Sequence, residues 1–254
     1  MSSIKLVSLN VERSKHLDLV IPFLVSADAD VICLQELMER DISAIEAATG
    51  MKCYFSPRSI FLARPGEETG VEGQGIFTRL SMTAQSTEYY AGQHDPIIEF
   101  GADKLESILR IARGITSVEF EKDGTLFRVS TTHFTWTPNG KASETQRVDL
   151  SAMMGMLAHK EFVLCGDFNA ARGLEIFDAI AATYKDNIPL SYETSVDYPM
   201  HREGEQIRQN AALAGLKGLV IDGLFTTPQY EASNVELCSG VSDHMAIVAT
   251  ITKK

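Results

Sequence analysis

The sequence predicts one domain of the α/β class, spanning residues 1–254, with β-strands in its core and helices outside. Short apolar runs alternate with helical stretches near both ends of the chain, as strand–helix units do. Between them, short β-type runs are separated by Gly, Pro and charged residues. No internal repeat or linker-like stretch divides the 254 residues, a length that suits one large domain.

Two strand–helix units open the chain. The apolar run Ile4–Leu9 predicts a strand, and the mixed stretch Ser14–Val25 predicts the helix that follows it. Val31–Leu34 is fully apolar, which is typical of a buried strand. Asp41–Ala48 predicts the second helix, which Gly50 would end.

The middle of the chain predicts short strands and a hairpin. The dipeptide Asp123-Gly124 is typical of a two-residue hairpin loop, and it would join Thr116–Phe120 to Thr125–Thr132. Other short strands are expected at Tyr54–Ser56, Ile60–Ala63, Gly75–Thr78 and Ile115–Glu119.

The strand–helix alternation returns in the last part of the chain. Ser143–Leu157 and Leu174–Ala182 predict helices. Strands are expected at Phe162–Cys165, Leu219–Phe225 and Met245–Ile251. These elements complete the predicted α/β pattern.

Two long polar segments, Ala84–Ile108 and Lys185–Gly215, show little periodicity. Long segments without secondary structure are uncommon inside a compact domain unless they have a function. We therefore expect functional loops there, which would decide the substrate.

Composition and charge limit the classes of protein. The chain is 44% hydrophobic and 22% charged, which is ordinary for a globular protein. No apolar run approaches the ~20 residues that a membrane helix needs, so no membrane span is expected. Met1–Leu6 also lacks the apolar stretch of a secretory signal. The net charge of −11 disfavours tight non-specific binding to nucleic acid, but it suits a site that attracts divalent cations.

The cysteines form no CxxC pair, and three of them lie in apolar runs. We therefore expect reduced core residues in a cytoplasmic protein, which we also expect to be a monomer. The four cysteines are Cys33, Cys53, Cys165 and Cys238.

Polar residues that could perform chemistry lie where the predicted strands end or begin. Carboxylates beside apolar runs are costly to bury unless they are paired or bind a cation. Oxygen ligands with few thiols suit Mg²⁺ or Mn²⁺ better than Zn²⁺. These polar residues are Asn10, Glu36, His133, Asp167, Asn169, Asp243 and His244, and Asp222 lies within a further strand.

Taken singly, each of these residues could have an ordinary structural role. Asp167 could cap the helix that follows it, and Glu36 could favour the N-terminus of its own following helix. Asn10 could form a turn, and His133 could be an ordinary hydrogen-bonded residue. For Glu12 we favour a structural role. For the strand-end residues, these separate structural roles would all have to hold at once, so a shared site is the better hypothesis.

Six fragments of the chain, in their order and spacing, resemble the endonuclease/exonuclease/phosphatase superfamily, which includes nucleases, inositol polyphosphate phosphatases, sphingomyelinases and deadenylases. The resemblance runs from residue 4 to residue 251. It implies a four-layer αββα sandwich, with two packed mixed β-sheets flanked by helices and the site at one edge. The fragments are Ser8-Leu9-Asn10-Val11, Cys33-Leu34-Gln35-Glu36, Thr132-His133-Phe134, Gly166-Asp167-Phe168-Asn169, Ile221-Asp222 and Ser242-Asp243-His244.

The resemblance also implies a metal site and a nucleophile. Glu36 would be the main ligand of Mg²⁺ or Mn²⁺, with Asn10 near the metal and Asp243 supporting the same side. Asp167 would orient or deprotonate the attacking water. Asn169 would donate a hydrogen bond to a phosphoryl oxygen.

Further roles are implied for two imidazoles and one arginine. His244, held by Asp222, would stabilise the charge on the reacting phosphoryl group or act as the base. His133 matches the strand-end His of several branches of the superfamily. Arg113, next to Gly114, resembles an Arg-Gly pair before the strand that precedes the His strand, and it is a candidate substrate-binding residue.

The sequence therefore predicts a metal-dependent phosphoric ester hydrolase, a phosphodiesterase, nuclease or phosphatase, in which an activated water attacks in line. Because Lys and Arg are scattered, we expect a small phosphoester or a nucleic-acid end or lesion as substrate. A non-specific or abasic-site DNA endonuclease is one alternative, and a non-catalytic binding module that kept the fold is another. A two-carboxylate glycosidase would leave Asn10 and the two His without a role.

Overall fold

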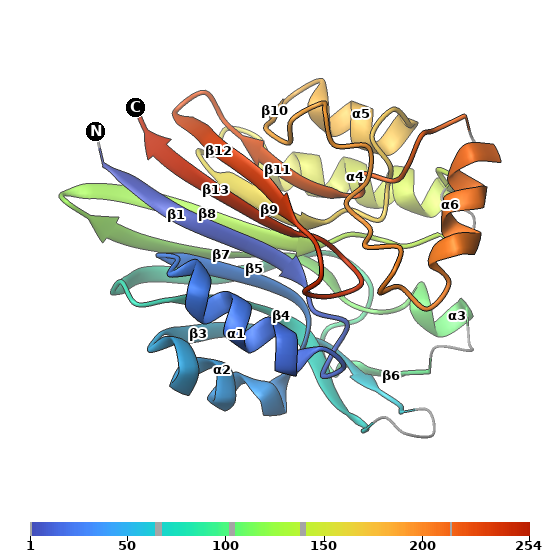
Figure 1. Cartoon of the computed structure of the whole chain (residues 1–254), viewed down its shortest axis with the longest axis horizontal. Helices are drawn as coiled ribbons and strands as arrows, with labels where there is room; N and C mark the ends of the chain where they lie inside the picture. Colours follow the sequence, from blue (N-terminus) through green and yellow to red (C-terminus); the bar gives the residue numbers. More distant parts are fainter. Residues whose placement is uncertain (1, 64–67, 102–104, 138–140, 214) are drawn as a thin grey trace.

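The computed structural model describes residues 2–63, 68–101, 105–137, 141–213 and 215–254. Within them the chain forms two packed mixed β-sheets with helices on both outer faces (Figure 1). The predicted four-layer αββα sandwich is confirmed.

The first sheet contains both ends of the described chain. Across the sheet the order is β12 (Tyr230–Cys238), β13 (Ala246–Lys253), β1 (Ser3–Asn10), β2 (Val31–Met38), β4 (Gly70–Thr78), β3 (Lys52–Phe61) and β6 (Ile98–Phe100). β1 pairs with β2 in parallel and with β13 in antiparallel orientation. The C-terminal end of β1 therefore lies next to the C-terminal end of β2 and the start of β13.

The second sheet is built from the middle of the chain and β11. Its order is β10 (Lys185–Asp186), β11 (Asp222–Thr226), β9 (Val163–Asp167), β8 (Thr125–His133), β7 (Arg113–Lys122) and β5 (Met82–Ala91). β8 and β9 are parallel, and β11 runs antiparallel to β9. The ends of β8 and β9 and the start of β11 therefore share one edge.

Helices cover the outer face of each sheet (Figure 1). The first sheet is covered by α1 (Leu17–Ala27) and α2 (Ile42–Thr49), which a 3₁₀ turn, η1 (Glu39–Asp41), precedes. The second is covered by α4 (Glu144–Leu157) and α5 (Glu175–Ala181). Two further helices, α3 (Leu105–Ile108) and α6 (Gly204–Leu213), lie at the end of the sandwich toward which β1, β8 and β9 run (Figure 1).

The core is divided by the sheets into three apolar layers. Between the sheets, Phe120 and Phe127 stack with their ring centroids 6.0 Å apart, and Tyr230 of β12 packs against them. The two outer layers lie beneath the helices. Because both faces of a sheet are covered, a central strand such as β9 is apolar on both faces until its last residues. Full burial of each large side chain contributes roughly 1.5–3 kcal/mol.

Our interpretation of the two long polar segments as loops is wrong in large part. Ala84–Ile108 contains most of β5 together with β6 and α3, and Lys185–Gly215 contains β10 and α6. β5 is an edge strand with a single buried residue, Tyr90, so it lacks the apolar alternation that reveals a strand. The sequence pattern does not reveal β12, another edge strand with few buried residues, for the same reason.

Other element boundaries differ modestly from expectation. β3 is continuous across the two short strands predicted there, because a β-bulge at Pro57–Ser59 bends it without ending it. α1 begins at Leu17, three residues after the predicted start, and contains Pro22. The cysteines are free thiols, as expected, and Cys33 and Cys165 lie in the layer between the sheets. No helix among the described residues is long and apolar enough to span a membrane.

Candidate functional site

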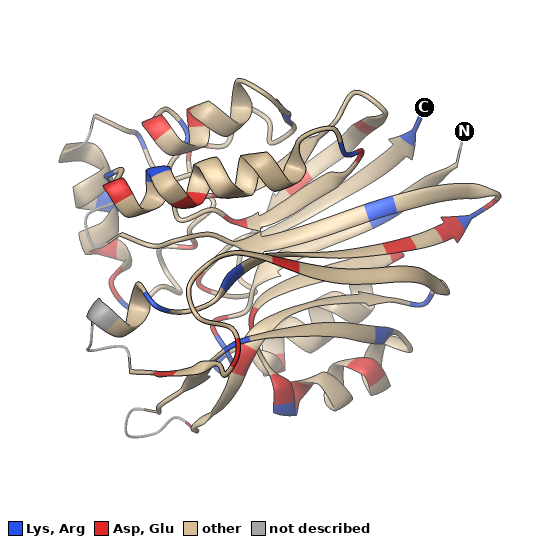
Figure 2. Cartoon of the chain, turned by 180° about the vertical axis from the view of Figure 1, so that it is seen from behind, with Lys and Arg blue, Asp and Glu red and all other residues tan. Residues whose placement is uncertain are grey.

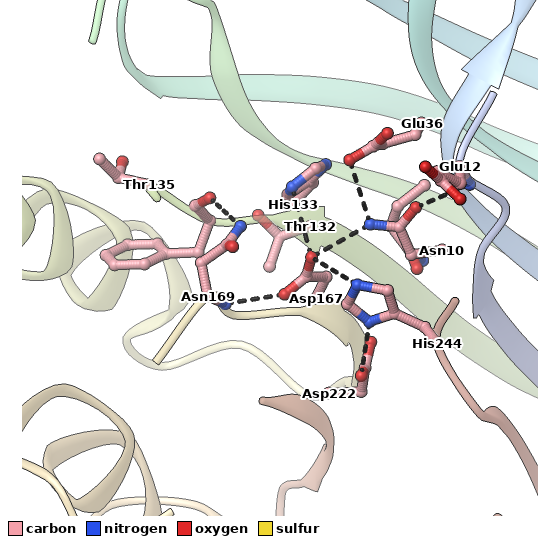
Figure 3. A network of polar contacts seen from close by, with 12 residues as sticks. Asn10, Glu12, Glu36, Thr132, His133, Thr135, Asp167, Asn169, Asp222 and His244 are labelled. Atoms are coloured by element: carbon pink, nitrogen blue, oxygen red, sulfur yellow. Dashed lines mark hydrogen bonds and ion pairs between the residues drawn. The ribbon is translucent and has the colours of Figure 1, made fainter. Parts of the chain in front are cut away.

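Three functional side chains come from neighbouring strands of the second sheet. The parallel register of β8 and β9 places His133 beside Asp167, and the antiparallel register of β11 places Asp222 on the other side of Asp167. All three side chains are at least nine-tenths buried. The strand ends therefore form one row, with Asp167 at its centre (Figure 3).

A glycine allows these strands to approach so closely. Gly166 has φ +142°, and a Cβ atom there would lie 1.9 Å from the carbonyl oxygen of Thr132 on β8. Any other residue would push β8 away from β9 at the last pair before the site. The glycine before Asp167 is therefore part of what positions the site.

The first sheet contributes Asn10 and Glu36 at the same edge. We expected the second strand to end at Leu34, but β2 continues to Met38 and bulges between Gln35 and Leu37. Glu36 is the bulged residue and has φ +52°. A β-bulge changes the direction of a side chain, and here it sends the carboxylate toward the second sheet.

Asn10 links the two sheets. Its Nδ2 donates to Asp167 Oδ2 at 3.1 Å and to Glu36 Oε1 at 3.3 Å (Figure 3). Its Oδ1 accepts the backbone N–H of Glu12 at 3.1 Å. In this geometry Asn10 orients two carboxylates, and its own oxygen is engaged with the backbone.

His244 pairs with Asp222 as the sequence predicts. His244 Nδ1 lies 2.9 Å from Asp222 Oδ2, and its Nε2 lies 3.8 Å from Asp167 Oδ2. Burial alone would lower the pKa of His244, but the charges of Asp222 and Asp167 raise it well above its ordinary value. An imidazole so placed is a strong candidate for a proton-carrying group.

Ser195 fixes the carboxylate that holds His244, and no pattern in the sequence identifies it. Its Oγ donates to Asp222 Oδ2 at 2.6 Å and accepts the backbone N–H groups of Ile221 and Asp222. Ser195 is fully buried, and its carbonyl accepts the backbone N–H of Met245. Ile221, just before β11, and Met245, just after His244, thus both donate hydrogen bonds to Ser195.

Asp167 is a buried carboxylate with several donors around it. Burial raises its pKa to about 6, against the opposing effect of the nearby charge of His244. Asn169 donates its backbone N–H to Asp167 Oδ1 at 2.8 Å and its Nδ2 to the carbonyl of Phe134 at 3.0 Å. Asn169 has φ +49°, a left-handed conformation that turns its side chain toward the site.

His133 lies between two arginines and Asp167. Its Nδ1 is 2.5 Å from Arg58 Nη1, and its Nε2 is 3.4 Å from Asp167 Oδ2. Burial and the charges of Arg58 and Arg113 lower the pKa of His133 well below its ordinary value. These surroundings favour the neutral form of the imidazole.

Arg113 lies behind His133. Its Nη1 donates to the carbonyls of His133 and Phe134, at 3.2 and 3.1 Å. Burial and the charge of Arg58 lower the pKa of Arg113 to about 9. These contacts support the strand end, and contact of Arg113 with a substrate stays a prediction.

Acidic groups gather on the other side of Asn10. Burial raises the pKa of Asp243 to about 7, and the nearby charges of Glu12 and Glu36 act in the same direction. His201, which the sequence pattern did not single out, has its Nε2 3.8 Å from Asp243 Oδ2. Glu12, for which we favoured a structural role, also pairs with Lys15 and His16.

Arg13 is the partner of Glu36. Its Nη1 lies 2.6 Å from Glu36 Oε2, and its guanidinium lies over the ring of Phe61 at 4.5 Å. Arg13 and Glu12 both have positive φ, so the backbone after β1 turns sharply back toward the site. Arg40, four residues after Glu36 in the sequence, pairs with Asp41 and Glu68 instead, so the fold supplies the partner of Glu36 from the segment after β1.

One group of side chains has ligand atoms close enough to hold a metal ion. Ligand atoms of Asp167, Asp222 and His244 lie within 4.8 Å of one another, and all three residues are buried. Beside them opens a cavity of about 380 Å³, which Glu36, Asn169, Asp243 and the face of α6 also line. The site thus combines acidic groups, a buried imidazole and space for a ligand.

The comparisons with known proteins agree with this architecture. The endonuclease/exonuclease/phosphatase family model matches residues 7–244. An endonuclease/exonuclease/phosphatase from Bacteroides vulgatus superposes with a TM-score of 0.71 at 18% identity, and 100% of each chain is covered. No curated protein matches the sequence significantly.

Two other solved structures share the fold. The catalytic domain of human nocturnin, solved with a bound sulfate anion, has a TM-score of 0.67 at 14% identity and covers 99% of this chain and 94% of its own. A mannosyl-6-phosphatase of Bacteroides thetaiotaomicron has a TM-score of 0.65 at 14% identity, with 98% and 99% covered. At such identities these structures show the fold alone. The family model spans nearly the whole described sandwich, so the chain belongs to the endonuclease/exonuclease/phosphatase family.

Proposed function

We propose that the protein is a Mg²⁺- or Mn²⁺-dependent phosphoesterase that hydrolyses a phosphodiester or phosphomonoester by in-line attack of an activated water. The observation that carries the proposal is the buried pair of His244 and Asp222, which faces Asp167 across the edge of the two sheets. A buried carboxyl and a buried imidazole whose pKa is raised, placed next to one cavity, are an arrangement that suits acid–base chemistry.

Each polar side chain has a role in this chemistry. Asp167 orients a water and accepts its proton, and Asn169 donates a hydrogen bond to a phosphoryl oxygen. His244, held by Asp222, donates to the phosphoryl group as negative charge develops on it. His133, whose surroundings favour the neutral imidazole, contacts Asp167 Oδ2 from the neighbouring strand and helps to position it.

The residues present fit a hard divalent cation. Glu36 and Asp243 line the same cavity and offer carboxylate oxygens, and the charge of Glu36 acts on Asp243. Oxygen donors without thiolates favour Mg²⁺ or Mn²⁺. When bound, such an ion would neutralise phosphate charge and polarise the phosphorus–oxygen bonds.

Two places could hold the ion, and we favour Glu36 with Asp243. The alternative is the group of Asp167, Asp222 and His244, whose ligand atoms lie within 4.8 Å of one another. However, Asp222 Oδ2 already accepts Ser195 Oγ at 2.6 Å and lies 2.9 Å from His244 Nδ1. A metal there would break the pair that orients the imidazole. Asn10 donates to both carboxylates, so it would hold Glu36 at the favoured metal site and Asp167 beside His244.

The charge distribution supports a small substrate. The net charge is −11, and Lys and Arg are dispersed among Asp and Glu over the ribbon (Figure 2). A surface that follows a long nucleic acid needs clustered basic residues. We therefore propose a small phosphoester, or the end or lesion of a nucleic acid, as the substrate class.

A hydrolysis screen tests the proposal. The substrates are bis(4-nitrophenyl) phosphate, sugar phosphates, nucleotides, inositol phosphates and short end-labelled oligonucleotides, each with Mg²⁺, Mn²⁺ or chelator. We expect turnover that needs the cation and that Glu36→Gln abolishes, whereas Glu121→Gln, an exposed acid on β7, keeps it. No hydrolysis of any substrate under these conditions would contradict the proposal.

A further inference from the structure

The cavity beside the site extends well beyond the groups that perform the chemistry. One wall holds His244, Asp167 and Asn169, and the opposite wall is the inner face of α6. Its volume of about 380 Å³ is in the lower part of the range for small-molecule pockets. The space thus suits a small organic group that is attached to the reacting phosphate.

An aromatic ring lines this cavity. Trp136 is the only tryptophan of the chain and is 37% exposed, whereas Thr135 and Thr137 on either side are buried. Thr135 Oγ1 donates to Asp149 at 2.6 Å, and Gln146 donates to the Thr135 carbonyl at 2.6 Å. The backbone that carries Trp136 is therefore held by α4, and the ring is exposed on a rigid support.

The rest of the cavity wall is largely apolar. The apolar side chains come from α6 and from the loops around it, and they are Leu174, Ile207, Ala211, Leu216, Leu219 and Ile221. α6 is held in place because Gly204 packs onto Tyr198, where a Cβ would lie 2.0 Å from the Tyr198 carbonyl oxygen. Tyr198 also accepts the backbone N–H of Leu219 at 3.1 Å through its hydroxyl.

The charges in the cavity exclude a densely phosphorylated ligand. Among its described lining residues Lys141 is the single Lys or Arg, whereas Glu36, Glu203, Asp167 and Asp243 are acidic. A divalent cation would balance part of this charge for one phosphoryl group, but nothing would balance several more. We therefore expect the organic part of the substrate to carry no further phosphate.

We propose that this cavity is a subsite for a flat, uncharged aromatic ring of nucleobase size on the substrate, which stacks against Trp136 and the apolar face of α6. Aromatic rings stack well on tryptophan, and an alkyl or sugar group of the same size gains less there. Gln206, which donates to Asn210 at 3.1 Å on α6, offers amide groups to the edge of such a ring. This inference rests on the proposed function, because the phosphate must bind at the site next to the ring.

The test measures binding, so it does not depend on turnover. The probes are adenosine 5′-monophosphate and ribose 5-phosphate, which share the phosphate and sugar and differ by the base. Binding to Asp167→Asn with Mg²⁺ is followed by the fluorescence of Trp136, excited at wavelengths that adenine does not absorb. We expect the nucleotide to quench Trp136 and to bind at least tenfold more tightly than ribose 5-phosphate.

Variants separate the ring subsite from the phosphate site. By calorimetry, Trp136→Leu and Ile207→Asn should each remove most of the advantage of the nucleotide and leave ribose 5-phosphate binding unchanged. Leu126→Asn, at an exposed residue at the start of β8, should preserve the advantage. Equal binding of the two probes, or quenching without a difference in affinity, would overturn the subsite. If the wild type hydrolyses nothing while the ring preference holds, the proposed function fails and the subsite stands.

Discussion

Replacing Arg13 by Gln is expected to strengthen the binding of Mg²⁺ about tenfold. Both oxygens of Glu36 are engaged, Oε2 with Arg13 Nη1 at 2.6 Å and Oε1 with Asn10 Nδ2 at 3.3 Å. A cation that binds Glu36 Oε2 therefore competes with the Arg13 guanidinium for that oxygen. The Arg13 and Glu36 side chains are 19% and 20% exposed, which places the pair between a surface ion pair and a buried one.

The expected magnitude follows from this partial exposure. A hydrogen bond to a charged group contributes roughly 1.5–3 kcal/mol. Because the Arg13–Glu36 pair is partly exposed to water, we expect its contribution at the lower end of this range. A difference of about 1.4 kcal/mol corresponds to a tenfold change in affinity. In the wild type, Arg13 can remain over Phe61 after it leaves Glu36, so the displacement needs no unfolding of the segment.

Calorimetric titration of metal-free protein with Mg²⁺ is the assay. Arg40→Gln is the matched control, because Arg40 lines the same hollow as Arg13 but pairs with Asp41 and Glu68. The control should change the affinity less than threefold. An affinity of Arg13→Gln equal to or weaker than that of the wild type would refute the reasoning, as would the same gain in Arg40→Gln.

Three further predictions concern stability and the imidazole pair. The folded pKa of Asp243, about 7, exceeds its ordinary value, so its contribution to stability is full at acidic pH and is lost as pH rises through 7. In chelator, the free energy of unfolding of Asp243→Asn minus that of the wild type should therefore rise by at least about 1 kcal/mol from pH 4 to pH 7, measured by denaturant unfolding. A difference that stays constant with pH would count against this prediction. Gly166→Ala would place a Cβ 1.9 Å from the Thr132 carbonyl oxygen, so it should lower the free energy of unfolding by about 2–3 kcal/mol in the same assay. An unchanged midpoint of denaturant unfolding would contradict this, because it would show that β8 moves away from β9 at little cost. Ser195→Ala should lower turnover about tenfold with little change in KM, since Asp222 loses a donor; unaltered turnover would remove Ser195 from the site.

The residues that the sequence predicted lie in contiguous fragments at strand ends. Asp167 and Asn169 follow a buried apolar run, and His244 precedes another, so the strand pattern alone places each of them at the end of a strand, although the two strands belong to different sheets. Cover on both faces of the apolar strands was also predictable from the pattern, whereas the four-layer sandwich was expected from the family resemblance. What the pattern does not contain is the pairing between the two sheets, which sets the contact of Asn10 with Asp167.

The residues that the sequence did not predict occupy bulges and loops. Arg58 reaches His133 from the β3 bulge, and Ser195 reaches Asp222 from an irregular segment. Arg13 reaches Glu36 because a backbone with positive φ turns it inward. Such positions follow from tertiary packing, which leaves no periodic signal in the sequence. The conformation of Glu36 itself depends on a bulge that no pattern revealed.

The most direct test of the central claim is the hydrolysis of bis(4-nitrophenyl) phosphate by the wild type and by His244→Ala at saturating Mg²⁺. The buried pair of His244 and Asp222 is the feature on which the proposed phosphoesterase depends. If His244 stabilises the charge on the reacting phosphoryl group, turnover should fall roughly a hundredfold or more while the variant stays folded. A loss of less than tenfold in a folded variant would contradict the account.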